Sequence, residues 1–309
     1  MENVKRSSAQ SITCNFRDAS GRLKLGWRLA LGTLTVVLGL YLAGLAGDLA
    51  ARWYGELSWL ARQFIQAAVM VAFVLPLICW LRIKVDRRTL AGIGFSEPKR
   101  ALRFFLLGLS IPAAILFLPL LIIAAGGWAS ITVNTSGPVI GLLLGWLIVA
   151  LLFEALPEEI AIRGYLYRNL STAMVRWLAA LASIGLFVCI PLTLALVQWL
   201  TGVGGDFGGT EGITADYLVI IVLFGAVLAY LRVVTGSVWT CVGFHLGFLQ
   251  LGRQAWVGDH EQALFMIEGA SAKPVDLTYQ LAVIIGLLVI LALPWLCGHR
   301  PGWREKDEA

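Results

Sequence analysis

The stretch VIGLLLGWLIVALLFEALPEEIAIRG, residues 139–164, places three glutamates and an arginine directly after a long apolar run. Such a run is typical of a membrane-spanning helix, which normally leaves the membrane through neutral or basic residues. In the helix that this pattern predicts, Glu154 and Glu158 are four residues apart, and so are Glu159 and Arg163. Two helix faces therefore carry acid, and the function depends on what those faces meet.

The whole chain is unusually apolar. Of its 309 residues 59% are hydrophobic and 14% are charged, and the mean hydropathy is +0.81. Soluble domains usually carry about 25% charged residues. The composition therefore excludes a soluble globular domain and predicts an all-α, polytopic transmembrane helix bundle.

Eight apolar segments are long enough, or nearly so, to cross a membrane, since a span needs about 20 residues. We place them near 29–47, 64–81, 104–125, 139–156, 177–200, 217–231, 236–251 and 277–297. Lys and Arg gather in every second loop and in both tails, which predicts that both termini are cytoplasmic. Residues 1–28 and 298–309 would then be cytoplasmic tails, and residues 29–297 the bundle.

Several other classes of protein are not indicated. The basic residues lie between apolar blocks and form no stripe with aromatic residues, so a nucleic-acid partner is not expected. The five cysteines are scattered without the spacing of a metal or redox motif, so no metal and no cofactor are expected. The N-terminal residues are polar for too long to resemble a removable signal peptide. The sequence does not indicate an oligomeric state.

The acids allow two interpretations. In the first, the span ends near Leu156, a cytoplasmic helix begins at Pro157, and Glu159 and Arg163 form a solvated ion pair. Such a pair is worth a few tenths of a kcal/mol. In the second, the acids face a water-filled cavity inside the bundle, where ionisable residues need partners or a function. A glutamate such as Glu158 could there take a proton from water.

The three histidines differ in their surroundings. His260 lies in a loop and His299 in the C-terminal tail, where solvated side chains are expected. His245 lies within the seventh apolar segment, where an imidazole needs a hydrogen-bond partner or a function. A structural role and a functional role are both open for His245, and the EExxxR pattern at 158–163 favours a functional one.

Two motifs fit one family. EEIAIRGYLY at 158–167 fits EExxxRG with an apolar tail, and TGSVWTCVGFH at 235–245 fits the lead-in to a final histidine motif. Together they resemble the CPBP family of intramembrane proteases, which includes the CAAX proteases and bacteriocin-processing (Abi) proteins. The resemblance covers about residues 90–250. It implies an endopeptidase, in a bacterial cell membrane, that cleaves membrane-associated, prenylated or leader-peptide substrates among membrane lipids.

The resemblance also implies a glutamic mechanism. Glu158 would deprotonate a water that attacks a peptide carbonyl, while Glu159 and Arg163 shape the site. His245 would help to stabilise the oxyanion. A protein-bound metal is not implied, because two glutamates and one histidine make a poor zinc site.

Two positions of the family pattern are substituted. The middle motif FxxxH reads FVCIP and ends at Pro191, and the last motif HxxxN reads HLGFL and ends at Leu249. Losing an oxyanion donor typically slows a reaction by a factor of about a hundred to a thousand. Losing an acid–base partner slows it by a factor of about a hundred to ten thousand. Whether Gln198 or Gln250 compensates is open.

Three functions are therefore open: an active endopeptidase, a catalytically impaired relative that serves as a scaffold or binds peptides or lipids, and a proton-coupled transporter. The transporter has least support, because no inverted repeat accompanies the acids. The endopeptidase hypothesis fails unless Glu158 and His245 meet at one cavity. The impaired relative gains support if Pro191 and Leu249 line the same cavity.

Overall fold

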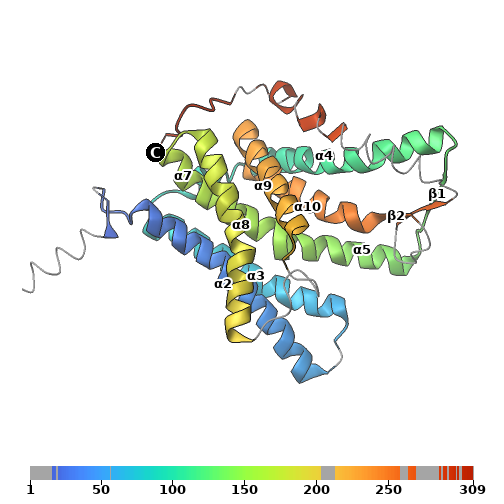
Figure 1. Cartoon of the computed structure of the whole chain (residues 1–309), viewed down its shortest axis with the longest axis horizontal. Helices are drawn as coiled ribbons and strands as arrows, with labels where there is room; N and C mark the ends of the chain where they lie inside the picture. The colour runs from blue at the N-terminus through green and yellow to red at the C-terminus, as the bar shows by residue number, and fades with distance from the viewer. Residues whose placement is uncertain are drawn as a thin grey trace, which may run out of the picture.

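The computed structural model describes residues 16–308 apart from 19, 56, 203–212, 258–263, 269–284, 287, 291, 297, 299 and 300. Long apolar helices make up most of this part of the chain (Figure 1). Six helical runs among the described residues are long and apolar enough to cross a membrane. The all-α membrane bundle predicted from composition is therefore confirmed.

The helices follow one another through short connections. In chain order they are α2 (Leu25–Tyr54), α3 (Trp59–Trp80), η1 (Leu81–Val85), η2 (Leu90–Ile93), α4 (Pro98–Ala125), α5 (Gly137–Ala150), η3 (Leu151–Ala155), α6 (Leu156–Glu159), η4 (Ile160–Leu166), α7 (Tyr167–Ala173), α8 (Arg176–Thr201), α9 (Ala215–Thr235) and α10 (Val238–Gln254).

Six of the eight predicted segments coincide with the six candidate spans. The seventh, 236–251, corresponds to α10, which has 17 residues and so lies just below the usual length of a span. Most of the eighth, 277–297, lies outside the described residues, as do His260 and His299. The count of eight and the cytoplasmic position of both termini stay predictions.

A small sheet at the ends of α4 and α5 was not predicted (Figure 1). It contains β1 (Ser130–Val133), β2 (Ala255–Val257) and β3 (Phe265–Glu268) in the order β1-β3-β2. β1 pairs antiparallel with β3, and β2 pairs parallel with β3. β1 lies in a segment expected to be a loop, but its sequence SITV is rich in residues that favour strands. The strands are too short to change the fold class.

α10 packs against α4 with the two backbones in close contact (Figure 1). A Cβ added to Gly243 would collide with the carbonyl oxygen of Phe105, and one added to Gly108 would collide with that of Thr240. Small residues commonly allow membrane helices to approach this closely. The contact fixes the position of α10, which carries His245.

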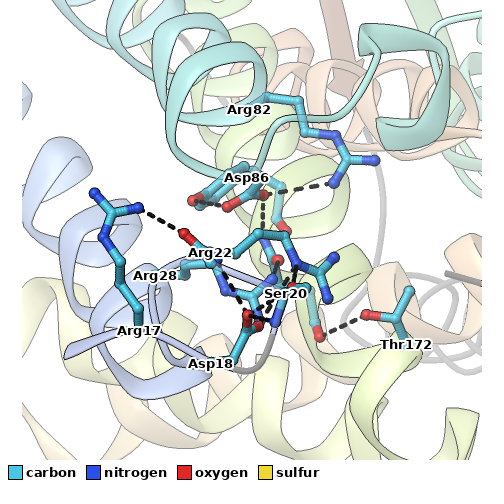
Figure 2. A network of polar contacts seen from close by, with 11 residues as sticks. Arg17, Asp18, Ser20, Arg22, Arg28, Arg82, Asp86 and Thr172 are labelled. Atoms are coloured by element: carbon cyan, nitrogen blue, oxygen red, sulfur yellow. Dashed lines mark hydrogen bonds and ion pairs between the residues drawn. The ribbon is translucent and has the colours of Figure 1, made fainter. Parts of the chain in front are cut away.

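A buried polar cluster joins the segment after α3 to η4 and α7. Asp86 is fully buried and accepts hydrogen bonds from Tyr165 (3.1 Å) and Asn169 (2.9 Å). Arg82 forms an ion pair with Asp86 at 3.5 Å. Arg28 of α2 donates to Asn169 at 2.6 Å. Figure 2 shows Arg82 directed at Asp86, with Arg28 close by. Asp86 therefore links three helical segments at one end of the bundle.

The described C-terminal residues dock on the turn between α7 and α8. Asp307 accepts hydrogen bonds from Ser171 and from Arg176, both at 2.7 Å. Burial alone would raise the pKa of Asp307, but these two hydrogen bonds and the charge of Arg168 outweigh it and lower the pKa. Asp307 therefore stays an ionised partner that holds the tail against the bundle.

We expect the substitution Asp86→Ala to destabilise the protein by about 3 to 5 kcal/mol, because it leaves the buried Arg82 without its carboxylate. The matched control is Asp48→Ala, which removes the partly exposed partner of Arg62 and should cost at most about 1 kcal/mol. Thermal unfolding of the detergent-solubilised protein, followed by circular dichroism, measures both. Equal shifts of the two variants would contradict a structural role for the buried cluster.

Candidate active site

A single helical run from Gly137 to Ala173 carries the acids. It passes from α5 through the π-helical turn η3, the short α6 and the π-helical η4 to α7. Pro157 lies in the first turn of α6 and does not end the run. π-helical turns are often found at functional sites. The interpretation in which the span ends near Leu156 and a separate helix begins is therefore wrong.

The pair formed by Glu159 and Arg163 is also not solvated. Both side chains are 0% exposed, and Arg163 donates to Oε1 of Glu159 at 3.0 Å. The same oxygen lies 2.9 Å from Nδ1 of His245. Burying an ionised carboxylate is costly unless it is paired and hydrogen-bonded. Glu159 therefore joins the EExxxR motif to the histidine on α10.

Two further helices surround the Arg163 guanidinium. Its central carbon lies 4.4 Å from the centre of the Phe187 ring on α8, a cation–π contact. A second nitrogen donates to the Gly225 carbonyl oxygen on α9 at 3.4 Å. Arg232, also on α9, donates to the main-chain carbonyl of Arg163 at 2.9 Å. The motif is thus held by contacts with α8, α9 and α10.

Glu158 is next to Glu159 in sequence but lies against a different part of the bundle. It lines a cavity of about 170 Å³, to which Glu154, Tyr217 and His245 also contribute. The remaining wall is mostly apolar and includes Leu40, Phe187, Ile190, Ile221, Phe224 and Phe248. The cavity therefore combines two carboxyl groups, a phenol and an imidazole with an apolar surface.

The two substituted family positions lie at this cavity. Pro191 of α8 and Leu249 of α10 both line it. Among the described residues that form its wall, neither Gln198 nor Gln250 is present. Among the described lining residues, no glutamine therefore takes the place of the missing histidine or asparagine. Glu158 and His245 thus line one cavity together with Pro191 and Leu249, which fits both an endopeptidase and a catalytically impaired relative.

The contact with Glu159 limits what His245 can do. An ionised carboxylate only accepts hydrogen bonds, so Nδ1 of His245 must carry a proton and donate it. Nε2 is then an acceptor in the neutral ring and a donor in the imidazolium. The edge-to-face contact with Phe224, at 4.8 Å between ring centres, further fixes the ring. His245 is therefore held as a base or as a donor, according to its protonation.

Tyr217 was not assigned to the site from sequence. It lies in the first turn of α9, where its backbone N–H donates to the capping Thr214 side chain at 3.2 Å. Its side chain lines the same cavity as Glu158 and Glu154. A tyrosine at the start of an apolar segment is usually an anchor at the membrane interface, so sequence alone did not separate the two roles.

The residues of the site lie in a part of the chain that matches a known family. A family model described as type II CAAX prenyl endopeptidase Rce1-like matches residues 140–248. The match extends from before Glu154 to beyond His245, and it confirms the resemblance to the CPBP and CAAX proteases. Over these residues the chain is similar to the CAAX proteases. Comparison with curated proteins and with solved structures found no match.

We expect Arg163→Met to destabilise the protein by about 3 to 5 kcal/mol, because Glu159 would lose its buried cation. The control Arg176→Met removes a partly exposed arginine that pairs with Asp307, and it should cost about 1 kcal/mol or less. Thermal unfolding in detergent measures the difference. A loss for Arg163→Met no larger than that of the control would show that the buried pair does not hold the site together.

Proposed function

We propose that this chain is an intramembrane endopeptidase that hydrolyses a peptide bond with a water activated by Glu158. The observation that carries the proposal is that Glu158 and His245, from separate helices, line one cavity. A base and an imidazole that meet at a shaped, largely apolar cavity are suited to acyl transfer to water. The family match to a type II CAAX prenyl endopeptidase description supports the same reaction class.

In the proposed reaction Glu158 takes a proton from a water molecule while the oxygen of that water attacks the peptide carbonyl carbon. Negative charge develops on the carbonyl oxygen, and protonated His245 donates to it from Nε2. The tetrahedral intermediate then re-forms the carbonyl as its C–N bond breaks, and the proton held by Glu158 passes to the leaving amine. Arg163 and Glu159 do not touch the reacting atoms: they hold the imidazole in position. The catalytic part of the proposal therefore rests on Glu158 and His245.

Tyr217 supplies a hydroxyl donor at a cavity where Pro191 and Leu249 offer none. A phenol can donate a hydrogen bond to a developing oxyanion, and it can also orient the attacking water. Tyr217 would then make up for part of the loss expected from the two substitutions.

The proposed substrates are membrane-associated proteins or peptides, including prenylated ones, in a bacterial cell membrane. The matching family is described as a CAAX prenyl endopeptidase, and the apolar wall formed by Phe187, Ile221, Phe224 and Phe248 suits an apolar chain next to the scissile bond. Burial of apolar surface would supply binding, whereas the few polar groups would fix orientation.

The test is cleavage of a panel of farnesylated peptides with CAAX termini by the purified protein in liposomes. We expect wild type to cleave, and Glu158→Gln to lower kcat by about a hundredfold or more, because the base is lost. Glu154→Gln is the matched control, since it changes the other carboxyl group of the cavity. Equal cleavage by wild type and Glu158→Gln would overturn the glutamic mechanism.

A second candidate function is a catalytically impaired relative that binds peptides or lipids. Pro191 and Leu249 favour it, because they give the cavity apolar side chains at the two positions where the family has polar ones. Under this alternative the same peptides bind to wild type and are cleaved neither by wild type nor by Glu158→Gln. Binding without cleavage would replace the first proposal with the second.

Removing the Tyr217 hydroxyl in Tyr217→Phe should lower kcat by about a hundredfold and change KM little, because the hydroxyl acts in the transition state. Tyr230→Phe is the control, since Tyr230 lies on the same helix and its ring stacks on Trp303, 6.1 Å away between ring centres. Steady-state cleavage of the best farnesylated peptide measures both variants. Unchanged kcat in Tyr217→Phe would remove Tyr217 from the mechanism.

A further inference from the structure

A second and larger hollow lies on the outer side of α4. It is an open groove of about 760 Å³ whose lining includes Lys99, Arg100 and Arg103 at one end and Phe104, Leu107 and Ser110 further along. It shares no lining residue with the cavity of Glu158 and His245. The groove is thus separate from the candidate active site.

The charged end of the groove is not neutralised by the protein. Within the described part of the chain, Lys99, Arg100 and Arg103 form no ion pair with a carboxylate, and no acidic side chain lines the groove. The Arg100 guanidinium lies 5.6 Å from the centre of the Phe104 ring, which directs it along α4. Three cations at one end favour an anionic ligand.

The other end of the groove is suited to a hydrocarbon chain. Leu106 and Leu107 contribute apolar surface, and Leu296 covers it from the C-terminal helical residues 292–296. The hydroxyl of Ser110 already donates to the Leu107 carbonyl at 2.8 Å, so it does not require a polar partner from a ligand. An anion with an apolar tail therefore matches both ends of the groove.

The length of the groove also matches one leaflet of a membrane. Residues 99–110 extend about 16 Å along the helix axis, at 1.5 Å per residue. Half of the roughly 30 Å hydrocarbon core is about 15 Å. Because α4 belongs to a candidate span, we expect its charged start at headgroup level and its apolar part at the depth of the acyl chains.

We propose that this groove binds an anionic phospholipid, with the phosphate held by Lys99, Arg100 and Arg103 and an acyl chain lying over Phe104 and Leu107. Clusters of Lys and Arg next to a membrane helix attract anionic headgroups, by about 1 kcal/mol for each cation. The bound lipid would contact α4, the helix against which α10 packs, at residues that do not line the Glu158 cavity. The proposal does not depend on catalysis.

The test is native mass spectrometry of the full-length, detergent-solubilised protein titrated with phosphatidylglycerol or with phosphatidylcholine of the same acyl chains. We expect phosphatidylglycerol to bind at least tenfold more tightly. The triple variant K99Q/R100Q/R103Q should lose about a hundredfold in affinity for it, since each cation contributes roughly fivefold. Leu106→Asn, at an exposed position in the apolar half, should weaken the binding of both lipids.

The matched control is K84Q/R304Q/K306Q, which removes the same charge from exposed cations outside the groove lining. It should bind phosphatidylglycerol as wild type does, and thermal unfolding without added lipid checks that both triple variants are folded. Equal losses in the two triple variants, or no preference over phosphatidylcholine, would overturn the proposal. Thermal unfolding is also measured with added inorganic phosphate and with added phosphatidylglycerol. An equal rise of the unfolding temperature with the two ligands would also overturn the proposal, because the groove would then recognise only the anion.

Discussion

The buried carboxylate of Glu159 is the constraint on which the site depends. A negative charge inside the bundle is stable only with partners. Oε1 of Glu159 has two of them, the Arg163 guanidinium at 3.0 Å and Nδ1 of His245 at 2.9 Å. The contact of Glu159 with His245 brings α10 against α6 and η4, and the contacts of Arg163 bring in Phe187 of α8 and Gly225 of α9. Glu158, which directly precedes Glu159, is thereby placed at the cavity that residues of these helices line.

Packing elsewhere supports this arrangement. The contact between the backbones of α4 and α10 at Gly108 and Gly243 fixes the helix that carries His245. The cluster around Asp86 anchors η4, which carries Arg163 of the motif, and α7, which follows it, to the segment after α3 and to α2. Apolar burial has little directional preference between membrane helices, so close packing of small residues and buried polar contacts determine their positions. The groove proposed to bind a lipid is lined by other residues of α4 than Gly108, which contacts α10.

Hydropathy was enough to predict the all-α bundle, because spanning helices are the simplest way to satisfy the backbone in lipid. The EExxxR motif and an isolated intramembrane histidine were enough to select Glu158, Glu159, Arg163 and His245 as the residues to examine. Two features of the site could not be predicted from spacing, because they depend on contacts between distant segments. One is the contact of Nδ1 of His245 with Glu159, and the other is the position of Pro191 and Leu249 at the cavity of Glu158. The small β-sheet and the role of Tyr217 were not predicted because the local sequence gives little signal: SITV is short, and Tyr217 has no motif around it.

The contact between Glu159 and His245 is tested most directly by a double-mutant cycle. Unfolding free energies of wild type, Glu159→Gln, His245→Gln and the double variant are measured in the same detergent. Because the two side chains are buried and share a hydrogen bond, the account predicts that the losses are not additive, with a coupling of about 1 to 3 kcal/mol. Additivity within about 0.5 kcal/mol would contradict it, since independent sites behave in that way.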